Sequence, residues 1–477
     1  MNTDGGRTTG DERKTTRYKK GSCWLEFSPL SSVIGRVAAG GQVRLLNINE
    51  DGFEKFLSKV EARGGQDTFE FEREVRSILK AVREQGDKAL IRYTHLFDGV
   101  RLPVQHFRIR KGEVKAAYRK IPQEFLGTLK KAADRIRTFH HVQKNKSVLA
   151  LERKAGSEKG ITLGQVITPL ERVGIYVPGG KASYPSTVLM AAIPAKVAGV
   201  RDIVMVTPPR KGGVSPAVLV AADLAGVDRI YQIGGVQAIG ALAYGTRTIP
   251  KVDKIVGPGN RYVAAAKKLV FGVVDIDMVA GPSEIVVISD EKTPPPYVAA
   301  DLISQAEHDE MALCLLITPS QAFGVKVREE LEKQLTSCER KKIARTSLNR
   351  RGAILIVRNL KQAVEVANRI APEHLELAVS NPSSLLKEVR HAGAVFLGPY
   401  TPEAIGDYLA GPNHILPTAG TARFSSSLGP EDFMKKTNLI GFTRAALKPF
   451  EKDVQRFTEW EGLKGHYRAV QLRLKRR

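Results

Sequence analysis

Cysteine is scarce in this chain of 477 residues, which contains only Cys23, Cys314 and Cys338. They lie far apart and form no CxxC pair, which argues against a disulfide framework and against a cysteine-rich zinc site. Such usage is typical of a reducing compartment, so we expect a cytoplasmic protein. The sequence also lacks any run of about 18 apolar residues, and we therefore expect no transmembrane helix.

Two familiar motifs are missing as well. No GxSxG elbow is present, which argues against a serine-nucleophile hydrolase. No complete GxGxxG fingerprint is present either, although "GPGNRY" (257–262) has two of the glycines and "VPGGKASYP" (177–185) has a glycine pair after a predicted strand. Glycines of this kind let a backbone approach a nucleotide, but tight strand-to-helix turns need them too. The spacing alone leaves both interpretations open.

Negative charge is in deficit: 74 Lys and Arg residues against 50 Asp and Glu residues give a formal net charge of +24. A basic protein can bind nucleic acid. However, the densest basic clusters, 339–351 and 473–477, contain no interleaved aromatic residues and match no nucleic-acid-binding motif. We interpret the excess as solvated basic surface that attracts anionic ligands, and we expect no dedicated nucleic-acid site.

Residues 1–43 differ from the rest in being polar, charged and rich in Gly and Thr, so we expect a disordered extension. Asp4, Asp11 and Glu12 are unusual for a transit peptide, and no apolar core with a small-residue cleavage site follows. The extension leaves organelle targeting open, but the cytoplasm remains the expected location.

Strand-length apolar runs alternate with helical stretches through most of the chain. The first series of runs is "VGIYV", "DIVMV", "RIYQI" and "DKIVG", and a second series starts at "EIVVISD" (284–290). This β-α-β-α order predicts parallel sheets covered by helices on both faces. We therefore expect an α/β fold with two doubly wound, Rossmann-like domains whose nucleotide fingerprints are incomplete. Residues 429–477 show helical, polar patterns without such runs and predict a small helical appendage.

Five stretches combine reactive side chains with turn residues. They are "AGPSEI" (280–285), "SQAEHD" (304–309), "IAPEHLEL" (370–377), "GDYLAGPNHILPT" (406–418) and "EWEGLKGHYRAV" (459–470). In the second stretch, Gln305 and His308 stand three apart near the end of a predicted helix and would share a face. Both a metal site and a polar helix end are compatible with that spacing, because His is a common metal ligand and Gln an uncommon one.

The third stretch predicts a change of structure. Pro372 disfavours helix at Ala371, so the preceding helix should end there. Glu373 and His374 then fall on a loop that leads into a strand, where they are either an acid–base pair or solvated polar residues. Ser283 is either a turn residue before a strand or a functional hydroxyl.

Taken together with "GIYVPGGKASYPSTVLMAAIPAKVAGV" (174–200) and "VDKIVGPGNRYVAAAK" (252–267), these stretches resemble the histidinol dehydrogenase family. The resemblance runs from about residue 45 to the C-terminus, in one order and with matching spacing. It implies an NAD-dependent, zinc-containing oxidoreductase that converts L-histidinol to L-histidine through a bound aldehyde. This reaction is the last step of histidine biosynthesis and uses two NAD⁺.

The resemblance also assigns roles to residues. One Zn²⁺ per subunit would be held by Gln305, His308, Asp407 and His466. Acid–base work would fall on Glu373 and His374, and further substrate contacts on Ser283 and Glu461. Contacts to NAD would fall on Tyr176, Gln237 and Asn260. These metal ligands and acid–base residues would also contact the substrate.

Finally, the family resemblance implies a homodimer with shared active sites and a division into domains. Residues 44–70 would pack with the C-terminal region, residues 71–175 and 283–428 would form the substrate and zinc domain, and residues 176–282 the NAD domain. Residues 429–477 would reach the partner, so that Glu461 and His466 act in trans. Two alternatives remain open: NAD-linked oxidation of another amino alcohol, and a basic nucleic-acid-binding protein that kept the scaffold.

Overall fold

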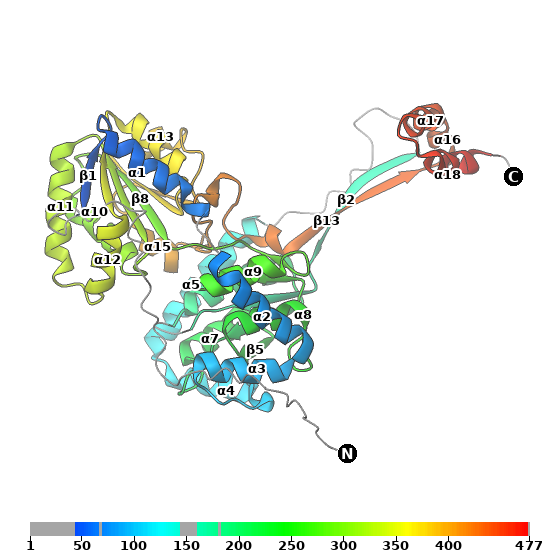
Figure 1. Ribbon diagram of the computed structural model, residues 1–477, viewed down its shortest axis with the longest axis horizontal. Helices are drawn as coiled ribbons and strands as arrows, with labels where there is room; N and C mark the ends of the chain where they lie inside the picture. The colour runs from blue at the N-terminus through cyan, green and yellow to red at the C-terminus, as the bar shows by residue number, and fades with distance from the viewer. Residues whose placement is uncertain (1–42, 66–68, 144–159, 180–182, 476–477) are drawn as a thin grey trace, which may run out of the picture.

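The protein is represented by a computed structural model, which describes residues 43–65, 69–143, 160–179 and 183–475 (Figure 1). The expected disordered extension, apart from Val43, lies outside the described residues. Cys314 and Cys338 are both free thiols. Among the described residues, no helix is long and apolar enough to cross a membrane.

Two parallel sheets form the body of the molecule, as the alternating pattern predicted. The larger has the order β1-β10-β9-β8-β11-β12 and the smaller the order β5-β4-β3-β6-β7. The strands of the larger sheet are β1 (Arg44–Asn47), β8 (Glu284–Ser289), β9 (Leu313–Thr318), β10 (Ala353–Ile356), β11 (His374–Ala378) and β12 (Ala394–Leu397). Those of the smaller sheet are β3 (Arg172–Tyr176), β4 (Asp202–Thr207), β5 (Arg229–Gln232), β6 (Lys254–Val256) and β7 (Asp275–Ile276).

Helices cover both faces of the smaller sheet. Alternate residues of a strand point to opposite faces, and in β4 both sets of residues are apolar. Ile203 and Met205 pack in one core, and Val204 and Val206 in the other. The first core is closed by α4 (Lys111–Ala117), α5 (Gln123–Gln143), α6 (Pro185–Ala198) and α7 (Pro216–Ala225). The second is closed by α2 (Phe69–Gln85), α3 (Asp87–Tyr93), α8 (Gly235–Tyr244) and α9 (Arg261–Val270).

This packing corrects the expected domain division. Residues 71–143 join the smaller sheet and not residues 283–428, because the apolar stripes of α2 and α5 cover faces of that sheet. The helical pattern in the sequence predicted these helices but carried no information about which sheet they cover.

The larger sheet is also covered on both faces. One core contains α10 (Pro295–Ala306), α11 (Gln321–Leu335) and α12 (Lys341–Arg351), and the other contains α1 (Asp51–Glu61), α13 (Leu360–Ile370) and α14 (Pro382–Leu386). The short helix α15 (Glu403–Tyr408) follows β12. Residues 44–61 therefore belong to this domain and do not pack with the C-terminal region as expected: β1 pairs with β10, and Phe53 and Leu57 of α1 are fully buried in its core.

A two-stranded arm projects away from both sheets (Figure 1). It consists of β2 (Ile161–Pro169) paired antiparallel with β13 (Met434–Phe442), and its tip carries α16 (Arg444–Leu447), α17 (Glu451–Trp460) and α18 (Lys464–Leu474). The prediction that 429–477 contains no strand is wrong. The sequence of β13, "MKKTNLIGF", gives no apolar run because most of its side chains are exposed to solvent.

Short turns of 3-10 or π helix complete the described structure. They are η1 (Ala62–Gly65), η2 (Thr94–Asp98), η3 (Val104–His106), η4 (Tyr118–Lys120), η5 (Thr421–Arg423), η6 (Pro430–Phe433) and η7 (Lys448–Phe450).

Candidate active site

Several buried polar side chains meet at the N-terminal edge of β8 and β11. Helix α13 ends at Ile370, as predicted from Pro372, and Ala371 takes a left-handed conformation with φ of 49°. The chain then enters β11 at His374, whose register partner is Ile285, one residue after Glu284 at the start of β8. Glu373 and His374 are 7% and 4% exposed. The interpretation of this pair as solvated loop residues is therefore wrong.

The hydrogen bonds of His374 define which of its nitrogens is free. Nδ1 donates to the carbonyl oxygen of Glu284 at 2.9 Å, whereas Nε2 is buried and has no hydrogen-bond partner among the described residues. Burial lowers the pKa of His374 to about 4, so the ring is neutral near pH 7. A neutral ring protonated on Nδ1 carries its lone pair on Nε2, which is the arrangement of a general base.

Glu373 is held from the same neighbour. Its Oε2 accepts the backbone N–H of Glu284 at 2.9 Å and lies 3.8 Å from His374 Nδ1. Burial raises the pKa of Glu373 well above its usual value, and nearby carboxylates add to this effect. The carboxyl group can therefore take up a proton at a higher pH than a solvated glutamate could.

A group of potential metal ligands adjoins this pair. Ligand atoms of His374, Glu403 and Asp407 all lie within 4.8 Å of one another. Gln305 is fully buried, and in the amide orientation that satisfies both its ends its nitrogen is 2.7 and 2.9 Å from the Glu403 oxygens. Burial and the neighbouring Asp407 raise the pKa of Glu403. The carboxylate oxygens of Glu403 and Asp407 and the amide of Gln305 are donors that fit a zinc ion beside the free Nε2 of His374.

His308 does not lie where the spacing suggested. Helix α10 ends at Ala306, and His308 falls in the following turn, exposed, while Gln305 is buried. The two side chains therefore do not share a helix face. His308 is still close enough that its charge lowers the pKa values of His374 and His414.

The other expected substrate residues divide into two groups. Ser283 lies directly before β8, half-buried, and its carbonyl oxygen accepts the N–H of Leu313 at 3.0 Å. Glu461 and His466 are exposed at the tip of the arm, away from the larger sheet (Figure 1). Within one chain, the structure brings Gln305, Asp407 and the Glu373–His374 pair together, but not these two.

The candidate NAD residues lie at the carboxyl edge of the smaller sheet. The strand order reverses between β3 and β6, which is where doubly wound sheets bind nucleotides. Tyr176 ends β3, and its hydroxyl accepts the N–H of Gly235 at 3.2 Å. Gln237 is fully buried, and neither of its amide atoms has a partner among the described residues. An orphaned buried amide at this edge fits a ligand that supplies both a donor and an acceptor.

The "GPGN" loop supports both interpretations that the spacing left open. Gly257 has φ of 111°, and a Cβ atom there would lie 2.2 Å from the carbonyl oxygen of Tyr176, so the turn itself requires glycine. Asn260 is the N-cap of α9, and its Oδ1 accepts the N–H groups of Tyr262 and Val263, both at 3.1 Å. These bonds leave its amide nitrogen for another partner.

His414 connects the metal-ligand group with the smaller domain. His414 donates through Nδ1 to the carbonyl oxygen of Asp407 at 2.9 Å, and its Nε2 is 3.5 Å from the hydroxyl of Thr187 on α6. The metal-ligand group of the larger domain therefore lies against the helix that follows β3 in the smaller domain. A substrate held at the first could face a dinucleotide held at the second.

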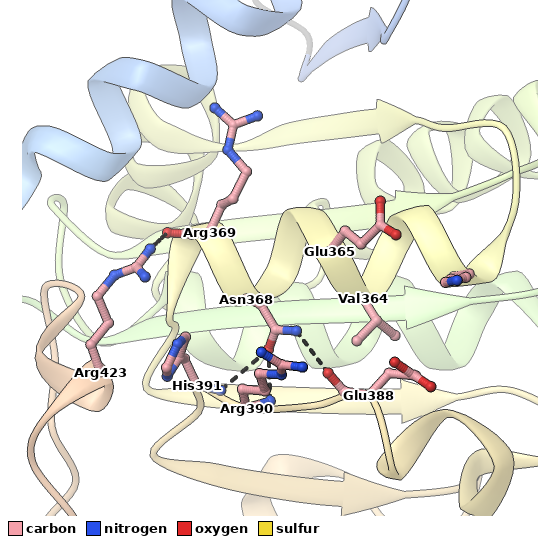
Figure 2. A pocket seen from close by; sticks show the side chains of 9 residues that line it. Val364, Glu365, Asn368, Arg369, Glu388, Arg390, His391 and Arg423 are labelled. Atoms are coloured by element: carbon pink, nitrogen blue, oxygen red, sulfur yellow. Dashed lines mark hydrogen bonds between the residues drawn. The ribbon is translucent and has the colours of Figure 1, made fainter.

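A separate pocket of about 390 Å³ lies beside α13 (Figure 2). Asn368, Arg369, Glu388, Arg390 and Arg423 are among its lining residues. It contains none of the expected site residues.

Three residues beside the acid–base pair and the metal-ligand group were not identified from the sequence: Arg63, Glu284 and Glu403. Glu403 lies four residues before Asp407, a spacing that places both on one face of a helix. Glu284 is a charged residue at the start of an otherwise apolar run. His414 was within a selected stretch but received no role.

Residues 61–474 match the histidinol dehydrogenase family. The chain belongs to this family. The histidinol dehydrogenase of Syntrophotalea carbinolica is 54% identical over 433 residues, which cover 91% of this chain and 99% of that protein. That of Bacillus cereus strain ATCC 14579 is 52% identical over 431 residues, with coverage of 90% and 99%. The structure of the enzyme from Elizabethkingia anophelis matches with a TM-score of 0.84 at 36% identity, covering 91% of this chain and 98% of that one.

Membership of the histidinol dehydrogenase family confirms several predictions. The chain is an oxidoreductase of histidine biosynthesis, from a family that depends on NAD and contains zinc. The two-domain α/β architecture is confirmed as well.

Proposed function

We propose that this chain oxidises L-histidinol to L-histidine in two hydride transfers at one centre, with Glu373 and His374 moving the protons. The observation that carries the proposal is the buried, unpartnered Nε2 of His374 beside Glu403 and Asp407. A base with this free lone pair, next to a group of cation ligands and facing a nucleotide-type sheet edge, suits oxidation of an alcohol.

Zinc, when bound, anchors the substrate, and NAD⁺ accepts the hydride in each step. Gln305, His308, Asp407 and His466 of the partner subunit would hold the zinc. Tyr176, Gln237 and Asn260 would contact NAD. Ser283 and the partner subunit's Glu461 would orient the substrate.

His374 acts first in this scheme. Its Nδ1–H bond to the Glu284 carbonyl fixes the ring, and Nε2 takes the proton of the alcohol as hydride leaves the carbon. Burial keeps the ring neutral, while the charge of Asp407 raises its pKa and so opposes the loss of basicity.

Glu373 acts in the second step. Its raised pKa suits a group that accepts a proton from water as the water adds to the bound aldehyde. Once His374 has released its first proton to solvent, its Nε2 takes the proton of the resulting diol as the second hydride leaves. Two adjacent groups suit two successive proton transfers at one carbon.

We also propose that the protein is a cytoplasmic homodimer whose arms exchange between subunits. Side chains on the arm support this: Ile440, Phe457 and Trp460 are 74%, 70% and 93% exposed in a single chain. Apolar side chains exposed to this degree in one region are typical of an interface. The exchange would carry Glu461 and His466 to the partner's site.

The roles of Glu373 and zinc are tested separately. Glu373→Gln should retain more activity in oxidising histidinol to the aldehyde than in oxidising the aldehyde to histidine, since only the second step needs the added water. Glu365→Gln, on the exposed side of α13, is the matched control. Equal losses in both half-reactions would remove the water-activating role from Glu373.

Removal of zinc by a chelator should abolish histidinol oxidation, and added zinc should restore it. Full turnover by protein shown to be metal-free would contradict the proposed metal site.

A further inference from the structure

A buried ion pair lies directly behind the acid–base residues. Arg63, in the turn after α1, is 7% exposed, and Glu284 is 2% exposed. The guanidinium donates from Nε and Nη2 to the two carboxylate oxygens at 2.5 and 2.7 Å. Neither residue has a part in the proton transfers described above. Burying two charges costs desolvation free energy, so we looked for a function of this ion pair.

Glu284 links this ion pair to both acid–base residues through its own backbone. Its N–H donates to Glu373 Oε2, and its carbonyl oxygen accepts from His374 Nδ1, both at 2.9 Å. A shift of residue 284 would therefore change the position of the carboxylate and of the imidazole together. It would also release the Nδ1 bond that fixes the tautomer of His374.

Arg63 also forms hydrogen bonds to the turn that leads to these residues. Its Nη2 donates to the carbonyl oxygen of Ile370 at 2.9 Å and, more weakly, to that of Ala371 at 3.5 Å. Its Nη1 donates to the carbonyl oxygen of Val60 at 2.7 Å. One side chain thus ties α1, the end of α13 and the start of β8 to one another.

Backbone strain is concentrated at the same place. Ala371 and Ala419 are the two non-glycine residues with positive φ among those described, at 49° and 55°. Ala371 contacts Arg63, and the N–H of Ala419 donates to Glu284 Oε1 at 3.2 Å. Left-handed backbone at residues other than glycine persists only where the surroundings enforce it. Here the ion pair contacts both strained residues.

We propose that the Arg63–Glu284 ion pair is a positioning element that holds Glu373 and His374 in their reactive geometry. The inference rests on the proposed function of these two residues. Arg63 and Glu284 contact no reacting atom in this scheme; they act by fixing the backbone at residues 284 and 370–371.

Two variants of Arg63 and one control separate positioning from general stabilisation. Arg63→Met removes all the bonds, whereas Arg63→Lys keeps the charge but cannot span both carboxylate oxygens and the three carbonyl groups. Arg369→Met is the matched control. Arg369 also joins α1 to α13, through Glu54 and Glu61, but its side chain does not reach residue 284.

In zinc-loaded protein, Arg63→Met should lower kcat for histidinol oxidation by roughly ten- to a hundredfold, the effect expected of a slightly misplaced catalytic group. KM for NAD⁺ should stay within about twofold of the wild type, since the displaced backbone forms no part of the proposed NAD site. Arg63→Lys should be intermediate, and Arg369→Met should match the wild type.

A second readout does not depend on turnover. Nitrogen-15 NMR of labelled imidazoles should show His374 protonated on Nδ1 in the wild type and a mixture of tautomers in Arg63→Met. A folded Arg63→Met with wild-type kcat and an unchanged tautomer would overturn the inference. If Arg63→Met does not fold, the same comparison applies to Arg63→Lys. Wild-type protein that gives no NADH from histidinol would instead contradict the proposed function, whatever the NMR result.

Discussion

At the scale of single residues, one physical cause prepares both members of the acid–base pair. Burial disfavours the charged form of any group, so it raises the pKa of Glu373 and lowers that of His374. Burial thus makes the Glu373 carboxylate a stronger base and keeps the His374 ring uncharged before substrate binds. The backbone of Glu284 then decides which atoms remain available, by bonding to one oxygen of the acid and to Nδ1 of the base.

His374→Asn tests the free nitrogen directly. The amide can still donate to the Glu284 carbonyl oxygen in place of Nδ1, but it has no counterpart of Nε2. We expect kcat to fall by roughly 10² to 10⁴ in both half-reactions, the usual contribution of a general base. Steady-state and single-turnover kinetics measure this, and a loss confined to one half-reaction would contradict the shared role.

Asp98 gives a stability prediction with a defined pH window. Burial raises its pKa from 3.8 to about 6, and its Oδ2 has no partner among the described residues. Because the native state binds this proton more tightly than the unfolded chain, wild-type stability falls as the pH rises from about 4 to about 6. Asp98→Asn cannot ionise. At about pH 7 its free energy of unfolding should exceed that of the wild type by roughly 1 kcal/mol, and its melting temperature should be correspondingly higher. This gain should vanish near pH 4.

Thermal denaturation at several pH values checks the Asp98 prediction. A difference between the two proteins that is independent of pH would show that Asp98 does not titrate in this window.

The sequence predicted individual residues unevenly, and for physical reasons. Gln305, Asp407 and the Glu373–His374 pair were identified because they lie in long family-like stretches. Glu284 was not, because its backbone bonds to the pair could come from any residue type and its carboxylate pairs with a residue far away in the chain. Arg63 was not identified either, since its partner is more than two hundred residues away in the chain.

At the scale of elements, the length of the apolar runs and their alternation with helical stretches predicted most strands of the two sheets. "DIVMV" and "EIVVISD" became β4 and β8 almost residue for residue. The arm strand β13 was missed, because a ribbon exposed on most of its surface has no apolar face to show in the sequence. The assignment of α2 and α5 to a sheet was also wrong, because amphipathic periodicity identifies a buried face but not what buries it.

Dimerisation should depend on the apolar side chains that are exposed on the arm. Ile440 on β13 is 74% exposed in one chain and would be buried in the proposed dimer. Ile440→Asp should weaken dimerisation at least about tenfold, since burial of such a side chain contributes roughly 1.5–3 kcal/mol. Thr437→Asp, exposed on the same strand, is the control. Sedimentation velocity over a range of concentrations measures both, and an unchanged dimer would place the interface elsewhere.

At the scale of the whole molecule, the two sheets and the arm have separate tasks. In the proposed scheme the smaller sheet presents its switch point to a dinucleotide, and the larger sheet gathers the acid–base pair and the metal ligands. The arm carries Glu461 and His466, which in one chain lie apart from both. A complete site therefore requires a second copy of the chain in this account.

Mixed dimers test that requirement. His374→Ala and His466→Ala should each be inactive alone. Refolded together in equal amounts, they should recover about a quarter of the wild-type activity, because half of the dimers are mixed and each has one intact site. Mixtures of His374→Ala with Glu373→Ala, whose defects lie in the same site, are the control and should recover much less. No recovery in the first mixture would argue against His466 acting in trans.

The most direct test of the account as a whole is the stoichiometry of the purified protein acting on L-histidinol with excess NAD⁺. We expect two NADH to form for each histidinol consumed, with L-histidine as the product and no free aldehyde accumulating. One NADH per substrate with release of the aldehyde, or no NADH at all, would contradict it.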